Sequence, residues 1–533
     1  MGFGLALLFS FPLVVAADPP PDIPATAPWG NVRRQIQSEQ DHRIGRSLPA
    51  QETEAMDVEK MLGGEAAESA RARSLEDRDV GALTKAANQG DADAQYWLGF
   101  AYYAGKDVRQ DVAEAARWWG KAADQGHARA QSNLGVVYYH GTGVRQDFAE
   151  AVRWYKKAAD RGIAEAQAGL GVAYSEGKGV RQDFAEALHW FRKGASQGNA
   201  GAQIDLGNAY YAGQGVRQDF AEAVRWYKKA ADQGNADAQN YLGNLYFDGK
   251  GVRQDNGEAV RWYKKAADQG NAYAQNQLGF AYDRGQGVRQ DHAEAVRWWK
   301  KAADQGNPKA QSNLGGAYES GDGVPRDHAE AVRWWKKAAD QGEAWAQFQL
   351  GFHFFFFSKA APQDYAEAIR WWKKAADQGE AWAQSSLGLA YFTGKGVRQD
   401  FAEAVRWYKK AADQGDAGAQ NSLGVAYFTG KGVPQDYAEA FRWYKKAADQ
   451  GDAGAQNSLG VAYFTGKGAP QNYVEAYFWG NLAAALGKGG AENAVASARD
   501  QAAAKLSPSE LSATQKRCRQ WVEAFERRRA QKR

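Results

Sequence analysis

Apolar residues recur with helical periodicity through most of the chain. In residues 111–126, a spacing of about 100° per residue gathers the apolar side chains on one arc and places Arg117, Lys121 and Asp124 on the opposite arc. The apolar arc comprises Val112, Ala115, Trp118, Trp119, Ala122 and Ala123. This pattern predicts an amphipathic helix with a wide apolar stripe.

The ends of this helix are marked as well. Asp111 and Glu114 have the spacing of a capping box, and Gly126 suits the left-handed position beyond a helix C-terminus. The preceding segment predicts a first helix, in which Gly99 is small enough to let a neighbouring helix approach. The shared face of that helix comprises Ala94, Leu98, Ala101 and Tyr102. The loops between the two helices usually read G-x-G-V, as at residues 141–144, and paired glycines fit a turn with positive φ.

This helix pair is repeated along the chain. The sixteen residues DFAEAVRWYKKAADQG occur at 219–234 and again at 400–415. The pattern A-Q-x-x-L-G places a glutamine every 36 residues, with one step of 37. These anchor glutamines are Gln95, Gln131, Gln167, Gln203, Gln239, Gln275, Gln311, Gln347, Gln384, Gln420 and Gln456. A fixed period of this length is typical of a solenoid, because two short helices with one apolar face each must stack on their neighbours.

The repeated motif A-x-A-Q-x-x-L-G-x-x-Y-x-x-G-x-G-V-x-Q-D-x-x-E-A-x-R-W-Y-x-K-A-A-D-Q-G resembles the Sel1-like repeat, a relative of the tetratricopeptide repeat, over roughly three quarters of the chain. The expected fold is all-α: a right-handed superhelical solenoid of about eleven 36-residue helix-turn-helix repeats with terminal capping helices. The resemblance implies an interaction scaffold that is often bacterial and often exported. A cysteine-rich branch of the family is associated with β-lactam binding or hydrolysis, but the repeats here contain no cysteine.

The chain ends differ from the repeats. Residues 1–17 are apolar and close on small residues, which predicts a secretory signal peptide cleaved near Ala17. Residues 18–74 are rich in proline and polar residues and predict a flexible tether, and residues 75–90 resemble a second helix that caps the array. We expect the eleven repeats to span residues 91–487. Residues 488–533 predict C-terminal capping helices with a basic tail, the last helix being capped by Ser507, Pro508 and Glu510.

No residue pattern in the chain indicates catalysis, a metal site or a cofactor site. Most of the twenty tryptophans lie in RWW or RWY on the apolar arc, where a core role is favoured over ligand stacking. The recurrent GKG lacks the spacing of a phosphate-binding loop, and the seven histidines form no cluster with metal-ligand spacing. The net charge of +4 is spread over mixed faces, apart from RRRAQKR at the C-terminus. Nucleic acid is therefore not an expected partner, and any membrane contact is expected to be peripheral.

The internal copies also predict a binding surface. Relative to the anchor glutamine, positions +1, +2, +5 and +8 vary freely and lie together on the first helix, which lines the concave face in repeats that this chain resembles. An exposed track of amides and aromatics there would suit an extended peptide, whereas the alternative is that the aromatics pack on the following loop. The candidate partner-binding residues are Tyr103, Tyr139, Tyr211, Phe247, Phe392, Phe428, Phe464, Asn133, Asn240, Asn276, Asn313, Asn421 and Asn457.

The eighth repeat, residues 343–379, contains the extra residue and lacks both loop glycines. We expect its first helix to extend or the superhelix to kink. Phe355, Phe356 and Phe357 are a candidate apolar patch: either they fill a gap that the insertion opens, which is favoured, or they form an exposed interface.

Together these features predict a monomeric, exported, periplasmic or secreted scaffold that is not an enzyme and that binds a protein or peptide through its concave face. One alternative is a binder or hydrolase of cell-wall or β-lactam-like substrates. The other is a structural spacer in the cell envelope.

Overall fold

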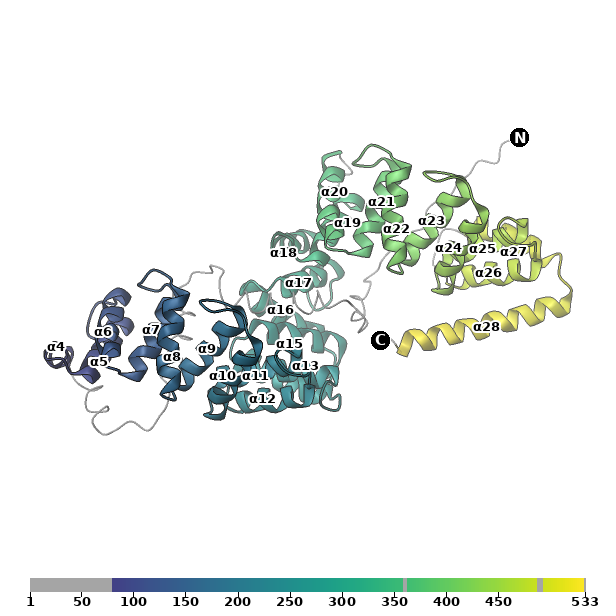
Figure 1. Cartoon of the computed structure of the whole chain (residues 1–533). Helices are drawn as coiled ribbons and strands as arrows, with labels where there is room; N and C mark the ends of the chain where they lie inside the picture. The colour runs from purple at the N-terminus through teal and green to yellow at the C-terminus, as the bar shows by residue number, and fades with distance from the viewer. Residues whose placement is uncertain (1–78, 358–361, 487–491, 532–533) are drawn as a thin grey trace. The chain divides into compact units, whose positions relative to one another are not determined.

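The computed structural model describes residues 79–357, 362–486 and 492–531, and these residues form helices joined by short loops (Figure 1). They divide into two compact units, residues 79–298 and the described residues from 299 onward. The predicted signal peptide and tether lie outside the described residues. No helix among the described residues has the length and apolar character needed to cross a bilayer.

The helices follow the predicted pairs. In the first unit they are α4 (Val80–Asn88), α5 (Ala92–Ala104), α6 (Val112–Asp124), α7 (Ala128–His140), α8 (Phe148–Asp160), α9 (Ala164–Glu176), α10 (Phe184–Ser196), α11 (Ala200–Ala212), α12 (Phe220–Asp232), α13 (Ala236–Asp248), α14 (Asn256–Asp268) and α15 (Ala272–Arg284). The boundary between the units falls within α16 (His292–Asp304). The second unit continues with α17 (Pro308–Ser320), α18 (His328–Asp340), α19 (Ala344–Phe356), α20 (Pro362–Asp377), α21 (Ala381–Thr393), α22 (Phe401–Asp413), α23 (Ala417–Thr429), α24 (Tyr437–Asp449), α25 (Ala453–Thr465), α26 (Tyr473–Leu486), α27 (Glu492–Ala503) and α28 (Pro508–Gln531). Within each unit, successive helices pack on each other, as expected of an all-α solenoid of helical hairpins.

The second helix of most pairs begins at a capping aspartate. In α6 the Asp111 side chain accepts a hydrogen bond from the backbone N–H of Glu114 at 3.0 Å, which confirms half of the predicted capping box. The other half is wrong. Glu114 pairs with Arg117 at 3.0 Å, because the N–H of Asp111 already donates to the carbonyl of Tyr102 at 2.9 Å.

The two helices of a pair meet at a glycine. In α17 a methyl group on Gly315 would lie 2.5 Å from Cδ1 of Trp335, whose indole N–H donates to the Ser312 carbonyl at 3.2 Å. The same position faces an aromatic ring from the second helix in Gly99, Gly135, Gly171, Gly207, Gly243, Gly351, Gly388 and Gly424. The prediction that this glycine permits close helix approach is confirmed.

The first aromatic residue of most RWW or RWY segments packs between repeats and under a lysine one turn later. Lys121 Nζ lies 3.6 Å from the ring centroid of Trp118, and Lys229 Nζ lies 3.9 Å from that of Trp226. The second aromatic is buried as well, as Trp119 and Trp335 show. The predicted core role of these segments is confirmed, and the lysine stems cover the outer edge of that core.

The loop glycines serve both conformation and packing. Gly141 and Gly143 have φ of 71° and 70°. A side chain on Gly143 would also lie 2.6 Å from the backbone carbon of Val112, at the start of the preceding second helix. Hence the second glycine is needed for the stacking of neighbouring repeats as well as for the turn.

The anchor glutamine connects three helices. Gln239 Nε2 donates to the Ala231 carbonyl of the preceding repeat at 3.1 Å, and Gln269 Nε2 donates to Gln239 Oε1 at 2.8 Å. Corresponding pairs, at 2.7–2.9 Å, are Gln125–Gln95, Gln197–Gln167, Gln233–Gln203, Gln341–Gln311, Gln378–Gln347, Gln414–Gln384 and Gln450–Gln420. All of the anchor glutamines are buried, so these bonds satisfy groups that water does not reach.

The eighth repeat departs from the predicted geometry. Its first helix, α19, ends at Phe356 and has the same 13 residues as its neighbours, so the predicted extension of the first helix is wrong. The second helix, α20, has 16 residues and begins ahead of the capping aspartate, with Asp364 inside its first turn. The loss of the loop glycines therefore lengthens the second helix at its N-terminus.

The C-terminal end of the array is covered by α27 and α28. The predicted cap of α28 is confirmed, since Ser507 Oγ accepts from the N–H of Glu510 at 3.3 Å and the Ser507 N–H donates to Glu510 Oε2 at 2.8 Å. Farther along α28, Cys518 lies half-buried against the Phe478 carbonyl at 3.6 Å. Burial raises the pKa of the Cys518 thiol to about 11, which keeps it protonated at neutral pH.

Candidate partner-binding surface

The predicted aromatic residues at position +8 pack against the second helix of their own repeat. None of them is exposed, and Tyr139 is buried. Each ring that meets an aromatic residue at the start of the second helix does so at a steep angle and at a centroid separation of 5.1–5.7 Å. These pairs are Tyr139–Phe148, Tyr211–Phe220, Phe392–Phe401, Phe428–Tyr437 and Phe464–Tyr473.

A lysine from the next repeat covers several of these ring pairs. Lys431 Nζ lies 5.4 Å from the ring centroid of Phe392 and 5.2 Å from that of Phe401. Lys467 has the same relation to Phe428 and Tyr437, at 5.5 and 5.1 Å. The aromatic residues at position +8 thus belong to a seam between repeats rather than to an exposed track, and their partner-binding role stays a prediction.

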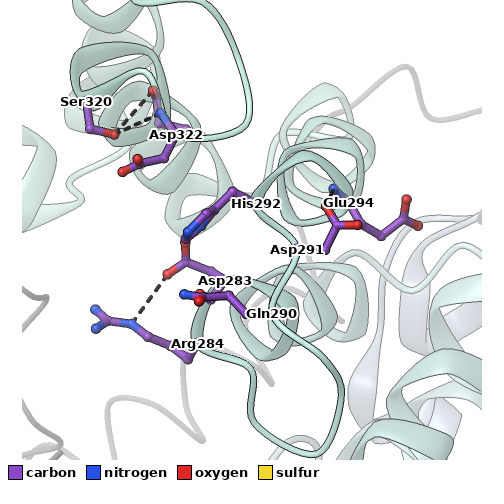
Figure 2. Close-up of polar contacts among 9 residues, drawn as sticks. Asp283, Arg284, Gln290, Asp291, His292, Glu294, Ser320 and Asp322 are labelled. Atoms are coloured by element: carbon purple, nitrogen blue, oxygen red, sulfur yellow. Dashed lines mark hydrogen bonds and ion pairs between the residues drawn. The ribbon is translucent and has the colours of Figure 1, made fainter.

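In two repeats a carboxylate and a histidine replace the aromatic pair. Asp283, at position +8, lies 2.9 Å from Nδ1 of His292, the first residue of α16 (Figure 2). Glu319 and His328 make the equivalent contact at 2.9 Å in the second unit. Because both positions change together, each pair fills the same seam with a polar contact, and this favours a packing role for position +8 over a recognition role.

The predicted amide residues are divided between buried and half-buried positions. Asn133, Asn240 and Asn276 are buried, whereas Asn313, Asn421 and Asn457 are half-buried. At positions +1 and +2 of one repeat, Asn276 Nδ2 lies 3.4 Å from Gln277 Oε1. Gln277 Nε2 in turn lies 3.4 Å from Asn244 Oδ1 of the preceding repeat. Several of these amides are therefore packing groups at the edge of the first-helix surface.

The three phenylalanines of the eighth repeat have different environments. Phe355 is 5% exposed and packs on Tyr365 and Trp372, with ring centroids 5.1 and 4.9 Å away. Phe356 and Phe357 are 42% and 60% exposed. Phe355 therefore fills the seam as the position +8 residue, while its two neighbours face solvent.

An aromatic stripe that sequence reasoning missed runs along α19. It comprises Trp345, Phe348, Phe352, Phe356 and Phe357 of α19 together with Trp382 of α21, and consecutive ring centroids lie 4.7–6.2 Å apart. The signal was present as apolar rings three to four residues apart in AWAQFQLGFHFFF.

The residues that precede the first helices form a second feature that was missed. In the middle repeats the N-cap is an asparagine (Asn199, Asn235, Asn271 and Asn307), but in the last four it is Glu343, Glu380, Asp416 or Asp452. Burial raises the pKa of each of these carboxyl groups above its usual range. The charge of Glu343 adds to this effect at Glu380, as that of Asp416 does at Asp452.

Comparison with known families settles the relationship that these repeats indicate. The family model of the Sel1 repeat matches residues 92–127, 128–163, 164–199, 200–235, 236–271, 272–307, 308–343, 346–380, 383–416, 417–452 and 453–488. The chain belongs to the Sel1 repeat family. A search of curated proteins found no match.

Two solved structures illustrate this Sel1 relationship. The chain is 37% identical to c5321, a protective antigen present in uropathogenic Escherichia coli strains that displays an SLR fold; the match covers 84% of this chain and 95% of that chain, with a TM-score of 0.70. It is also 31% identical to a Sel1 repeat protein from Oxalobacter formigenes over 46% of this chain and 96% of that chain, with a TM-score of 0.42. A Sel1 repeat scaffold suggests a role in protein–protein interaction.

No group of three or more His, Cys, Asp or Glu side chains is arranged to hold a metal ion within the part of the chain that the structure describes. The two histidine–carboxylate pairs stand where other Sel1 repeats of this chain have packed aromatic rings.

We expect Phe428→Ala to lower the free energy of unfolding around α23 and α24 by about 1–2 kcal/mol, because the ring is half-buried between Tyr437 and Lys467. Hydrogen exchange followed by mass spectrometry would measure the loss locally. Phe428→Leu, which retains most of the apolar volume, should show a smaller loss. Unchanged exchange in Phe428→Ala would contradict the packing role.

We expect Asp416→Asn to raise stability at neutral pH. Burial raises the pKa of Asp416 above its ordinary 3.8, so ionisation disfavours the folded state, and this penalty grows as pH rises from about 3.8 through the folded pKa. Asparagine keeps the N-cap, since Asn235 accepts from the Ala238 N–H at 3.0 Å in the same position. Urea unfolding of both proteins at several pH values between about 4 and 7 should show a gain that shrinks on acidification; a gain independent of pH would count against this account.

Proposed function

We propose that this chain is an exported, non-catalytic scaffold that binds a protein or peptide through the solvent-facing surface of its first helices. The observation that carries the proposal is the contrast between the two sides of these helices. The packing side keeps a buried anchor glutamine, a leucine and a glycine in repeat after repeat. The solvent-facing side varies: two residues before the anchor it presents Asp93, Arg129, Glu165, Gly201, Asp237, Tyr273, Lys309, Trp345, Trp382, Gly418 and Gly454.

This variation is what a recognition surface on a repeat scaffold requires. The fold fixes the residues that hold neighbouring repeats together, so the remaining positions are free to match a partner. Large, partly exposed aromatic side chains such as Tyr273, Trp345 and Trp382 are the types that anchor protein interfaces. An extended surface of this kind suits a peptide or a protein segment that contacts several repeats.

The binding surface is tested by site-specific photocross-linking. Benzoylphenylalanine in place of Tyr273, which is 39% exposed on α15, should cross-link the partner in cells that produce the protein. The same group in place of Lys228, exposed on the second helix α12, is the matched control and should cross-link weakly. Equal cross-linking at both positions, or more at Lys228, would argue against the first-helix surface.

Export and the absence of catalysis are tested separately. Intact mass spectrometry should find a mature chain that begins at Ala17 or Asp18 outside the cytoplasm, and cytoplasmic protein that retains Met1 would contradict export. Purified protein should not turn over a chromogenic β-lactam or a peptidoglycan fragment above background. Saturable turnover that one side-chain replacement abolishes would overturn the scaffold role.

A further inference from the structure

The aromatic stripe on α19 and α21 is larger than the fold needs. The seam of the eighth repeat is already filled by Phe355, which contacts Tyr365 and Trp372. The positions of the stripe hold smaller or polar side chains in later repeats that fold in the same way. These are Ser385 and Asn421 in place of Phe348, Val425 in place of Phe352, and Gly418 in place of Trp345.

The exposure of the stripe carries a free-energy cost. Burying one large apolar side chain contributes roughly 1.5–3 kcal/mol, and Phe356 and Phe357 forgo much of this at 42% and 60% exposure. Trp345 and Trp382, whose centroids lie 5.3 Å apart, join two successive first helices into one surface. A contiguous aromatic surface of this kind marks an interaction site.

Two carboxylates flank the stripe in sequence: Glu343 already interacts with Lys309 of α17, whereas no basic residue is among the groups that shift the pKa of Glu380. The helices α19, α21, α23 and α25 contain no Lys, Arg, Asp or Glu along their length. Glu343 and Glu380 stand two residues before Trp345 and Trp382. Glu343 accepts a hydrogen bond from the Ala346 N–H at 2.5 Å, whereas the Glu380 side chain makes no such cap bond. The carboxylate of Glu380, two residues before Trp382, is therefore not occupied by a cap bond.

These carboxylates are not needed to begin the helices. Asparagine performs the same cap in four earlier repeats, as Asn307 does at 2.9 Å from the Ala310 N–H. Burial raises the pKa of Glu343 and Glu380, so ionisation of either carboxyl group is unfavourable in the folded state. A cation brought to this position by a partner would relieve that cost.

We propose that the aromatic stripe, together with Glu343 and Glu380, binds an extended segment of another protein in which a lysine or arginine lies next to aromatic or aliphatic side chains. This inference rests on the proposed scaffold function and names the partner chemistry. The cation would lie over the indole rings with its charge toward Glu380, while the apolar side chains cover Phe352, Phe356 and Phe357. The same kind of cation–π contact occurs within the chain, where Lys374 Nζ lies 4.2 Å from the ring centroid of Trp371.

The test uses the full chain and a phage-displayed library of random short peptides. The wild-type protein should enrich peptides with a basic residue beside aromatic or aliphatic residues. The variant Phe356→Ser/Phe357→Ser should bind the best synthetic peptide roughly tenfold or more weakly, because it removes exposed anchors. The variant Glu343→Gln/Glu380→Gln should retain apolar peptides and lose the preference for basic residues, with a weaker salt dependence of fluorescence anisotropy titrations.

The outcomes separate the two proposals. If the protein enriches no peptide, both the scaffold function and this inference fail. If it enriches acidic or purely polar peptides, or if the best peptide binds both variants as well as wild type, the scaffold function stands and the inference is overturned. Concentration-dependent dimerisation that Phe356→Ser/Phe357→Ser abolishes would show a second copy of the chain to be the occupant and would also overturn it. Unchanged helicity and thermal unfolding of the variants, which alter exposed or half-exposed side chains, verify that loss of binding is not loss of fold.

Discussion

Replacing Gly315 with alanine should lower the free energy of unfolding of its repeat by about 1–3 kcal/mol, although alanine is the better helix former. The added methyl group would lie 2.5 Å from Cδ1 and 2.6 Å from Nε1 of Trp335. The indole cannot move aside freely, because it is among the most deeply buried side chains and donates to the Ser312 carbonyl. Either the two helices separate or the hydrogen bond is lost.

The next residue along the same helix provides the control. A methyl group on Gly316 would meet nothing within 4 Å. Gly316→Ala should therefore leave the repeat unchanged or stabilise it by up to about 1 kcal/mol, as expected from helix propensity alone. Because repeat stability is close to a sum of local terms, hydrogen exchange in α17 and α18 would report both changes directly. Equal effects of the two substitutions would refute the role assigned to Gly315.

The repeat period and the second helix could be predicted from sequence because their causes are local or are copied many times. Asp111 as a cap, the apolar arc with Trp118 and Trp119, and the paired loop glycines each follow from side-chain chemistry or from a required backbone angle. Eleven copies of one unit repeat the same evidence. The buried anchor glutamine was recognised as constant in the sequence, but its two hydrogen bonds depend on helices that only stacking brings together.

The candidate binding residues were harder to predict because exposure depends on partners distant in sequence. Phe392 varies between copies in the manner of a surface residue, yet its ring contacts Phe401 and lies beneath Lys431 of the next repeat. These contacts do not show when each position is compared across the repeats by itself. The sequence did indicate the contact in one repeat, where Asp283 and His292 together replace the two aromatic residues. Two positions that change together are often in contact.

The eighth repeat shows a second limit. The missing loop glycines were correctly recognised as incompatible with the usual turn, but helix extension was possible on either side of the insertion. The extension occurs in α20, ahead of Asp364. Which of two helices lengthens depends on small differences in packing that no local pattern records. The aromatic stripe of α19, in contrast, was visible from its spacing: Phe348 and Phe352 stand at positions +1 and +5, but Trp345 and Phe356 stand at −2 and +9, outside the positions from which the binding surface was predicted.

The anchor glutamines Gln131 and Gln456 have a buried side-chain oxygen without a partner, and the first of them reveals the worth of one hydrogen bond. Gln239 uses both ends of its amide, whereas Gln131 uses only Nε2, which donates to the Ala123 carbonyl at 3.0 Å. The residue that should donate to the Gln131 oxygen is Arg161, which donates to the Gly126 carbonyl instead. Gln131 Oε1 is left buried without a partner.

Replacing either anchor with leucine should destabilise the first unit, but by different amounts. Gln239→Leu removes two hydrogen bonds, one to the Ala231 carbonyl, which keeps the Gly234 N–H at 3.0 Å, and one from the exposed Gln269 amide, and each lost bond costs about 0.5–1.5 kcal/mol. Gln131→Leu removes only one hydrogen bond, to the Ala123 carbonyl, which keeps the Gly126 N–H at 2.9 Å. It also removes an oxygen that already lacked a partner, so its loss should be smaller by about 1 kcal/mol or more. Urea unfolding followed by circular dichroism, with hydrogen exchange to locate the change, would measure both. Equal losses would mean that the glutamine pair between second and first helices adds nothing to stability. The loss in both variants would then come from the hydrogen bond that the anchor amide donates to the preceding helix. That bond would be the main contribution of the anchor glutamines to stacking.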